Sequence, residues 1–558
     1  MIEKAITKFR DAWKKDGVIY CFYLIAVLVV YWRTVSVGFF SDDYHMLSVF
    51  SSNPSVFRFV FGNIVGEFGG GSYGPVFALF HYAEYKLFGL NAWPYHLVSL
   101  FLHSANAFLV YTLVKILTKR RYLAVISGFV FALAAHQVFA IVWIAVLPHL
   151  LATFLALLSI CFFIRQIGNP GHRDYLISLL FFILSICTKE NAIFLPLILG
   201  LYFVFLSEHN IKRRVVLVFF KISPFVVSAA IFFLARYSVT SSTVGFYAQA
   251  STGLDWAHYR SMFFDLFADF FVDYPRRVVW HDWLVQNWFW GGVLLLPFAV
   301  VWFAWREKWR TSLGFFLSLL ISLVAFLPLS LSRWNDGGER YTYYISVFFW
   351  PYIILTIDAV LMNARIWRTK LSWGKFFSIC LLLFFLVVNI LKIFPKQNRW
   401  IASGQRVKTM LASVDEIDFN DKYTVFVGLP DNLDGAEVIR NAIKEAIKIE
   451  TGVQVIGERI PLYSVLGSEA DAFSFVSNGK TGQIAGQVVF TPSAGIHFTG
   501  FKEYSRPFAD FSLIGYVKPD MGQKIAIVGK RDKFWYDGRY LPLQYVFFDG
   551  KKLVKIDE

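Results

Sequence analysis

Hydrophobic and polar positions along the chain alternate in long blocks rather than residue by residue. Apolar runs lie near residues 18–34, 95–117, 122–136, 148–166, 175–188, 191–207, 215–236, 288–305, 311–330, 341–361 and 376–394. Many of them reach about 18 to 22 residues, which is the length of a helix that crosses a bilayer. The pattern therefore predicts a mainly α-helical, polytopic membrane protein with about eleven transmembrane helices.

Basic clusters separate these runs and predict their orientation. They are "TKRR" (118–121), "RQIGNPGHR" (165–173), "KRR" (212–214), "REKWR" (306–310) and "ARIWRTKLSWGK" (364–375), and the first 17 residues are also basic. Positive charge favours the cytoplasmic side, so we expect a cytoplasmic N-terminus and, with an odd number of spans, a C-terminus outside. The first run is long and no small-residue cleavage site follows it, so we do not expect a cleavable signal.

Three long segments are then expected outside: 35–94, 237–287 and everything after about residue 395. In the second, acidic residues recur opposite phenylalanines, which predicts an amphipathic helix lying in the membrane interface. The acids are Asp265, Asp269 and Asp273, and the aromatic residues are Phe263, Phe267, Phe270 and Phe271.

The last segment has ordinary polarity and enough residues for a separate domain. A strand is predicted at 423–428 and a turn at "LPDNLDG" (429–435), and "GQVVFTP" and "KIAIVG" predict later strands. A helix should follow the turn with one apolar face made of Val438, Ile439, Ala442, Ile443, Ala446 and Ile447. We therefore expect a transmembrane domain over 1–395 and an extracytoplasmic α/β or α+β domain over 396–558, in which no catalytic motif is evident.

Composition supports the membrane assignment and excludes some other classes. The chain is 56% hydrophobic and only 17% charged, which no soluble protein of this size could bury. The net charge of +15 is concentrated at the ends of apolar runs, so it indicates helix orientation rather than nucleic-acid binding. The four cysteines lie in or beside apolar runs without paired spacing, which argues against disulfides and zinc. No Asn-x-Ser/Thr acceptor with a non-proline middle residue occurs, which favours a bacterial source.

Two adjacent carboxylates follow the first apolar run, in "SVGFFSDDYHMLSVF" (36–50). A charge at the bilayer centre costs roughly 2.5–3.5 kcal/mol, and less near the edge, so acids in this position are either solvated or used. In one interpretation, Asp42 and Asp43 mark the exit from the membrane and meet water. In the other, one of them is a general base whose pKa the neighbouring carboxylate raises, or the pair holds an acceptor or a cation.

Several later segments bear on this choice. They are "GSYGPVFALFHYAEYKLFGLNAWPYHLVSLFLHSANAFLVYTLV", "FALAAHQVFAIVWIAVLPHLLATFLALLSI", "ILSICTKENAIFLPLILGLYF" and "LPLSLSRWNDGGERYTYYISVFF". Together and in this order they resemble the GT-C membrane glycosyltransferases, above all the protein O-mannosyltransferase-like branch and its bacterial relatives. The resemblance covers roughly residues 18 to 395.

The resemblance implies roles for particular residues. Asp42 and Asp43 match the acidic pair in which such enzymes keep their catalytic base, and we favour Asp42. Lys189 and Glu190 of "TKEN" match a Lys-Glu step at the outer end of a span. A further match is the Glu-Arg-Tyr step formed by Glu339, Arg340 and Tyr341. The predicted topology places all three sites on the outer face.

An outward-facing enzyme of this family takes its sugar from a polyprenyl phosphate, because nucleotide sugars stay in the cytoplasm. Lys189 and Arg340 are the expected phosphate ligands, and Glu339 is expected to orient Arg340. Both cations could instead be snorkelling anchors at helix ends. The acceptor would be a hydroxyl of a glycan, lipid or protein, and direct displacement favours inversion.

The sequence also departs from the family pattern. Tyr73-Gly74-Pro75-Val76 lacks the arginine of the usual Tyr-Arg-Pro-Leu, and His149 stands where relatives carry a carboxylate. His149 could contact the acceptor or could be a satisfied polar group. His45 with the acidic pair would give an incomplete metal site, so no cofactor is expected and a divalent cation is not favoured.

Two other functions stay open: a transporter or flippase of a lipid-linked or anionic substrate, and a non-enzymatic assembly factor on the same scaffold. Transporters usually carry charged sites near the midplane and internal repeats. Here the notable charges lie at one face and no repeat is found. The expected location is the bacterial inner membrane.

Overall fold

The computed structural model describes most of the helical region and the regular elements of the C-terminal region. The described residues are 2–63, 73–169, 171–241, 266, 268–271, 309–324, 339–363, 373–427, 429–433, 436–439, 442–459, 463–466, 473–477, 484–490, 495–497, 505–506, 509–514, 524–529, 533–536, 539–548 and 552–555. They form two compact units. The first comprises Met1–Val35 and Ser55–Gln397, and the second comprises Ser36–Pro54 and Asn398–Glu558.

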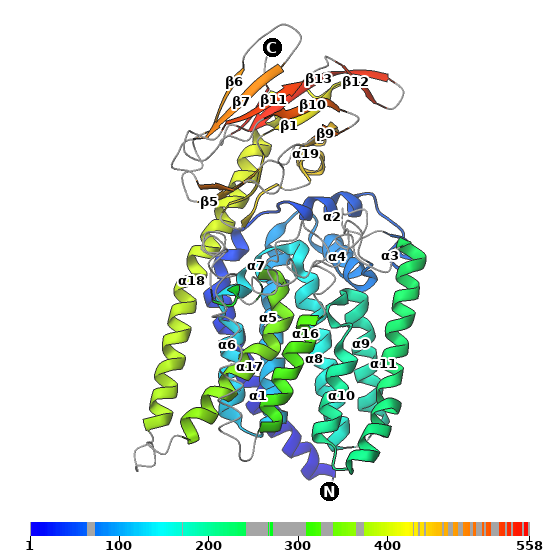
Figure 1. Cartoon of the computed structure of the whole chain (residues 1–558), viewed down its shortest axis with the longest axis vertical. Coiled ribbons are helices and arrows are strands. Elements are labelled where there is room, and N and C mark those ends of the chain that lie inside the picture. Colours follow the sequence, from blue (N-terminus) through cyan, green and yellow to red (C-terminus); the bar gives the residue numbers. More distant parts are fainter. Residues whose placement is uncertain are drawn as a thin grey trace. The chain divides into compact units, whose positions relative to one another are not determined.

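The first unit is a bundle of helices (Figure 1). Its helices are α1 (Ile2–Tyr31), α3 (Val56–Phe61), α4 (Pro75–Phe88), α5 (Ala92–Thr118), α6 (Arg121–Ala132), α7 (Val138–Val142), α8 (Leu147–Gly168), α9 (His172–Thr188), α10 (Leu195–Leu206), α11 (Ile211–Thr240), α16 (Trp309–Val324), α17 (Glu339–Asn363) and α18 (Trp373–Ala412), the last of which runs on into the second unit. Short 3-10 turns lie between them, among them η3 (Ala135–Gln137) and η5 (Glu190–Ala192). Every predicted apolar run that contains described residues overlaps one of these helices. The run at 288–305 lies outside the described residues.

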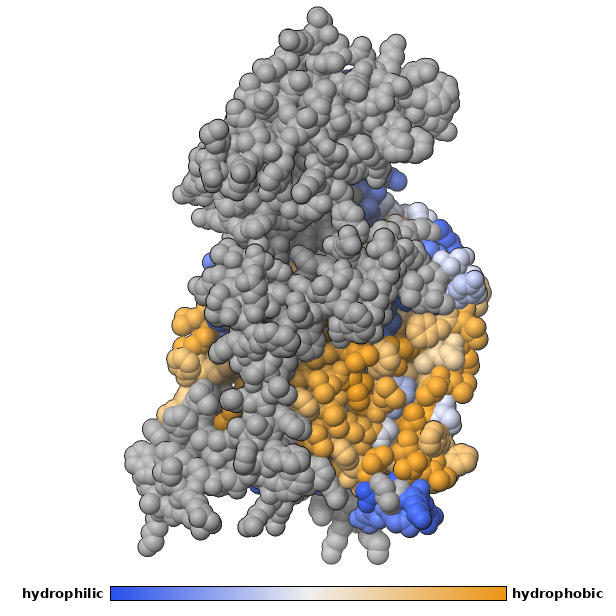
Figure 2. Space-filling view, in the orientation of Figure 1, coloured by the Kyte–Doolittle hydropathy of each residue, from blue (hydrophilic) through white to orange (hydrophobic). Residues whose placement is uncertain are grey.

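Four stretches of the described chain are long and apolar enough to cross a membrane by length and composition. They are Asp16–Ser36, Ala92–Thr118, Ile144–Gly168 and Lys212–Thr240, and the bent pair Arg121–Ala132 and Ala135–Val142 would make a fifth. Figure 2 shows hydrophobic residues gathered in a band across the described helices, with hydrophilic residues below it. The predicted class, a mainly helical membrane protein with a smaller C-terminal mixed domain, is confirmed, while the count of eleven spans stays a prediction.

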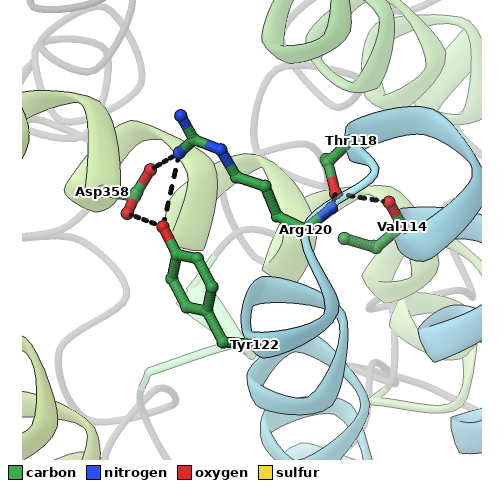
Figure 3. Close-up of polar contacts among 5 residues, drawn as sticks. All are labelled: Val114, Thr118, Arg120, Tyr122 and Asp358. Atoms are coloured by element: carbon green, nitrogen blue, oxygen red, sulfur yellow. Dashed lines mark hydrogen bonds and ion pairs between the residues drawn. The ribbon is translucent and has the colours of Figure 1, made fainter.

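Ion pairs tie the helices together at the end of the bundle where the basic loops lie, called here the basic-loop end. Arg120 Nη1 lies 2.5 Å from Asp358 Oδ2, and the Tyr122 hydroxyl donates to Asp358 Oδ1 at 2.7 Å (Figure 3). This contact joins the start of α6 to the last turns of α17. Asp16 of α1 pairs with Lys115 of α5 at 2.5 Å. Because successive helices run in opposite directions, the ends that do not reach the basic loops gather at the opposite end of the bundle, called here the site end.

The second unit is built around a mixed sheet. Strand β1 (Tyr423–Val427) pairs in parallel with β13 (Arg539–Phe548) and with β4 (Ile456–Arg459). Strands β12 (Lys533–Tyr536) and β14 (Leu553–Lys555) pair antiparallel to β13. Helix α19 (Ile443–Thr451) lies in the chain between β1 and the parallel β4, which is the crossover that parallel strands require.

Two further sheets complete the described strands of this unit. The first has the order β6 (Phe473–Ser477), β7 (Ile484–Phe490), β11 (Lys524–Gly529), β10 (Ala509–Ile514) and β9 (Ser505–Arg506). The second has the order β3 (Ala436–Glu437), β2 (Pro430–Leu433), β5 (Tyr463–Leu466) and β8 (Gly495–His497). The strands expected in "GQVVFTP" and "KIAIVG" are β7 and β11.

Some boundaries in this region differ from the sequence-based ones. The expected turn at 429–435 contains the short strands β2 and β3 instead, and α19 begins at Ile443, after Val438 and Ile439. The apolar stripe was nevertheless informative, because all six of its residues are buried. The first residues of the stripe precede the helix and the later ones lie in it. Burial alone does not distinguish a non-helical segment from a helix.

The segment Ser36–Pro54 belongs to the second unit, although the sequence placed it in the transmembrane domain. Its helix α2 (Asp42–Ser51) packs against α19, and the Tyr44 hydroxyl donates to Glu450 at 3.0 Å. The expected domain boundary near residue 395 falls inside the continuous helix α18.

The expected amphipathic helix near 263–273 lies mostly outside the described residues. Within the described part, Asp269 is buried, although the prediction placed it on a polar face. Phe270 stacks on Phe349 of α17 with 4.0 Å between ring centroids. This short stretch is therefore covered by packing on α17. The amphipathic pattern of the sequence does not reveal that packing.

Helices α1 and α6 approach closely at Gly128. A Cβ there would lie 2.5 Å from Tyr23 Cζ and 3.0 Å from the Ala107 carbonyl oxygen. The buried Tyr23 donates its hydroxyl proton to the Val125 carbonyl oxygen at 3.0 Å, so its ring cannot move without losing that bond.

We predict that Gly128→Ala destabilises the helical unit by about 1–3 kcal/mol, the usual cost of overpacking. The measurement is the melting temperature of the purified protein in detergent. Gly17→Ala on α1 is the matched control, because nothing lies within 4 Å of its added Cβ. Equal melting temperatures for the two variants would contradict the close approach.

Candidate functional site

His149 lies where three separate segments of the helical unit meet. Helix α8 begins at Leu147 with Pro148 in its first turn, and the His149 side chain is buried. The Asn191 side-chain nitrogen lies 3.0 Å from His149 Nδ1, and the Tyr341 ring packs edge-on against the imidazole at 5.6 Å between centroids. The positive charges of Lys189 and Arg340 both act on this ring. The structure therefore brings together the predicted residues of the "TKEN" and Glu-Arg-Tyr motifs.

Arg340 is surrounded by aromatic rings. Its guanidinium carbon lies 4.8 Å from the ring centroid of Tyr341, 5.5 Å from that of Phe139 and 5.7 Å from that of Trp143. Cation–π contact stabilises a guanidinium through its faces, while its N–H donors stay in the plane. The Arg340 Nη2 also donates to the Tyr341 hydroxyl at 3.4 Å. A guanidinium fork suits an anion with several oxygens, such as a phosphate.

Glu339 forms an ion pair that the sequence did not predict. Its Oε1 lies 2.5 Å from Lys396 Nζ, and both side chains are about 7% exposed. The expected role of Glu339 in orienting Arg340 stays a prediction, and Lys396 is one charge partner that the structure gives to Glu339. Lys396 was missed because it follows the last apolar run and looks like an ordinary cation beyond a helix end.

Lys189 and Glu190 form the link between α9 and α10. Lys189 ends α9 with extended backbone (φ −159°, ψ 141°), and Glu190 opens the 3-10 turn η5. Arg236 Nη1 of α11 lies 3.6 Å from Glu190 Oε1, and the Arg236 side chain is 2% exposed. Arg236 was also missed, because it closes an apolar run where basic residues often serve as anchors.

The sequence contained a signal for both missed cations. Arg236 and Lys396 occur at the predicted outer ends of their helices, where positive residues are disfavoured. Lys189 also lies at the predicted outer end of its span.

Gly74 explains one departure from the family pattern. A Cβ at this position would lie 2.9 Å from the Thr188 carbonyl oxygen, so a side chain would collide with backbone next to Lys189. The preceding Tyr73 ring packs against Phe232, one turn before Arg236 on α11. A cation therefore reaches this part of the unit from α11 rather than from position 74.

Six of the charged side chains described above have a net positive charge. The cations are Lys189, Arg236, Arg340 and Lys396, and the carboxylates are Glu190 and Glu339. Together these six side chains carry a net charge of +2. An excess of positive charge at buried helix ends favours an anionic ligand.

The acidic pair lies in the second unit, and its two members differ. Asp43 is fully buried, and its Oδ2 accepts a hydrogen bond from the Phe40 amide at 3.2 Å, which holds the turn before α2. Asp42 opens α2 and keeps part of its side chain exposed. Of the two, Asp42 has the solvent contact that proton transfer needs.

The turn before α2 is tied to the C-terminal part of the chain. Ser41 adopts a positive φ of 48°, a conformation that is uncommon outside glycine. Its amide donates to the Val438 carbonyl oxygen at 3.1 Å. The predicted base is therefore held in place by residues of the second unit.

His45 was weighed as a metal ligand beside the two aspartates. In the structure its Nδ1 lies 3.6 Å from Glu445 of α19. Among the described residues, no group of three His, Cys, Asp or Glu side chains is placed to hold a metal ion.

No family model and no curated protein matches the chain. Among solved structures, it resembles the oligosaccharyltransferase of Archaeoglobus fulgidus with a TM-score of 0.44 and 11% identity over 79% of this chain and 62% of that one. It also resembles ArnT from Cupriavidus metallidurans, with a TM-score of 0.42 and 12% identity over 82% of this chain and 96% of that one. The chain spans about three fifths of the length of the oligosaccharyltransferase.

A further structure of ArnT, with undecaprenyl phosphate bound, gives a TM-score of 0.40. These are GT-C membrane glycosyltransferases, the superfamily that the sequence motifs resemble.

The buried Glu339–Lys396 pair should be sensitive to the loss of one partner. We predict that Lys396→Met lowers the stability of the helical unit by about 3–5 kcal/mol, because it leaves a carboxylate buried without its charge partner. The double variant Lys396→Met/Glu339→Gln should regain much of that loss. Melting temperatures in detergent measure the order.

Lys212→Met is the control for this prediction, because it removes an exposed cation at the basic-loop end. It should melt within experimental error of the wild-type protein. A double variant that is no more stable than Lys396→Met would show that the two side chains are not coupled.

Proposed function

We propose that this chain is an integral-membrane glycosyltransferase that moves a sugar from a polyprenyl-phosphate donor to an extracytoplasmic hydroxyl. The observation that carries the proposal is the meeting of Lys189, Arg340 and His149 at one end of the helical unit. These residues come from three helix ends that are far apart in the sequence. In this proposal, the site end faces the outside and the basic-loop end faces the cytoplasm of a bacterial inner membrane.

The charge at the site end fits the departing group better than the donor. A polyprenyl-phosphate sugar is a diester with one negative charge, whereas the released monoester carries about −1.5 to −2 at pH 7. The four cations Lys189, Arg236, Arg340 and Lys396 with the two acids Glu190 and Glu339 supply a net +2. Cations that gain attraction as the bond breaks stabilise the transition state more than the ground state, which accelerates the reaction.

The reaction needs one proton acceptor. In the proposed step, the Asp42 carboxylate takes the proton of the acceptor hydroxyl, and the hydroxyl oxygen attacks the anomeric carbon. The bond between that carbon and the phosphate oxygen breaks, and its electron pair leaves with the polyprenyl phosphate. Attack from the side opposite the phosphate inverts the anomeric centre. No metal or cofactor takes part in this step.

The remaining residues have supporting roles in the proposal. Tyr341 packs against both His149 and Arg340, so it helps to fix their relative position. His149 offers a polar edge to the acceptor or the sugar. Glu190 and Glu339 balance the buried cations Arg236 and Lys396. The acceptor class is a glycan, a lipid or a protein hydroxyl.

The donor can be identified directly. Purified protein is heated with each member of a panel of polyprenyl-phosphate monosaccharides, and the donor is the one that raises the melting temperature and supports transfer. Stabilisation by no member of the panel, with transfer from none, would reject the proposed function.

Asp42→Asn should reduce sugar transfer by about 10²–10⁴-fold, the usual contribution of a general base. Binding of the donor and the melting temperature should change little, because Asp42 is partly exposed. Transfer is measured with purified enzyme and the identified donor. Asp418→Asn, an exposed acid of the same unit, is the control and should keep wild-type rates. Normal transfer by Asp42→Asn would exclude Asp42 as the base.

Lys189→Met and Arg340→Met should each weaken binding of polyprenyl phosphate by roughly 10- to 100-fold, since a hydrogen bond to a charged group contributes about 1.5–3 kcal/mol. The affinity of each variant is measured in detergent with the polyprenyl phosphate alone. Arg173→Met, an exposed cation in the first turn of α9, is the control and should bind normally. Unchanged affinity in both site variants would remove them as phosphate ligands.

A further inference from the structure

Arg236 is a buried charge on a helix that is otherwise largely open to its surroundings. Only 17% of the apolar stretch of α11 is buried within the described structure, yet the Arg236 side chain is 2% exposed. A charged residue inside a membrane helix is costly unless it faces the bundle and finds a partner. Its position on the packed side of α11 therefore calls for an explanation.

The ion pair of Arg236 with Glu190 reaches the segment that carries Lys189. The two side chains are 3.6 Å apart, and Arg236 lies in the last turns of α11, at the site end. Tyr73 packs on Phe232, one turn earlier on the same helix, at 5.8 Å between ring centroids. Close packing thus fixes α11 against the segment that precedes α4 and against the link after α9.

Glu190 has two cations within reach of its charge, Lys189 and Arg236. Within the described part of the chain, the Lys189 ammonium makes no hydrogen bond and no ion pair, although its charge acts on His149. Arg236 takes the carboxylate that would otherwise be the nearest counterion for Lys189.

We propose that Arg236 is a positioning residue of the donor site: by pairing with Glu190, it leaves the Lys189 ammonium for the phosphate of a polyprenyl-phosphate donor. This inference rests on the proposed function and extends it to a residue that does not itself touch the donor. It also explains the acid beside Lys189. A carboxylate next to a phosphate-binding lysine would weaken anion binding, unless a second cation holds it.

The test compares five proteins by their affinity for polyprenyl phosphate in detergent: wild type, Arg236→Met, Glu190→Gln, the double variant and Lys189→Met. Arg236→Met should bind about 10-fold more weakly or worse, because Glu190 is released to neutralise Lys189. Glu190→Gln should bind at least as tightly as wild type. The double variant should return to within about 3-fold of wild type, since the competing charge is gone.

Rescue by the second mutation is what separates positioning from other roles. If Arg236 bound the phosphate directly, the double variant would stay as weak as Arg236→Met, and the inference would be wrong. If Arg236 only supported the fold, Arg236→Met would lower the melting temperature without a change in affinity for the folded fraction, which would also overturn it. Arg236→Lys, which keeps the charge, should bind better than Arg236→Met.

The design also works if Arg236→Met does not fold. The double variant has no unpaired carboxylate at position 190, and its affinity then decides the question alone: near wild type supports the inference, and a 10-fold loss contradicts it. Lys189→Met separates this inference from the proposed function. Normal binding by Lys189→Met would reject the donor site itself, whereas weak binding by Lys189→Met with normal binding by Arg236→Met would reject only the role of Arg236.

Discussion

The cost of burying charge among membrane helices is the constraint on which the helical unit depends. An ion moved out of water loses several kcal/mol of solvation, and a partner at hydrogen-bonding distance has to offset that loss. At the basic-loop end, Asp358 meets Arg120 and Asp16 meets Lys115. At the site end, two further pairs, Glu190–Arg236 and Glu339–Lys396, follow the same rule. Each pair joins two helices, so the compensation of charge also decides which helix ends lie together.

Lys189 and Arg340 stand apart from these pairs in the kind of contact that holds them. Arg340 is held by three aromatic rings, and Lys189 lies next to an acid whose ion-pair partner is Arg236. Aromatic rings restrain a cation without cancelling its charge. An acid that is already paired with a second cation likewise neutralises a neighbouring lysine less. The contacts described for Arg340 are thus with aromatic rings, whereas those described for Arg120 and Lys115 at the basic-loop end include a carboxylate.

The sequence predicted the helices well because their length and hydropathy are imposed by the membrane, independently of the rest of the chain. It also named Lys189, Arg340, Tyr341 and His149, through motifs whose order in the chain is informative, and the structure brings these four together. Arg236 and Lys396 were missed, because their position at outer helix ends marks them as unusual cations but does not show whether each meets water or a buried acid. The sequence also did not show that α2 belongs to the second unit, because no local pattern indicates which distant residues pack against a segment.

The acidic segment has a consequence for the biosynthesis of this protein. Tyr44 meets Glu450 across 406 residues of chain, and the buried Thr424 and Gln544 side chains meet across 120. At a synthesis rate of roughly 5–20 residues per second, the turn that carries Asp42 waits about 20–80 seconds for its partner to be made. Strand β1 waits further for β13, and such long-range pairing is slow to form. A nascent chain can therefore insert its helices before the turn that carries Asp42 has met Glu450.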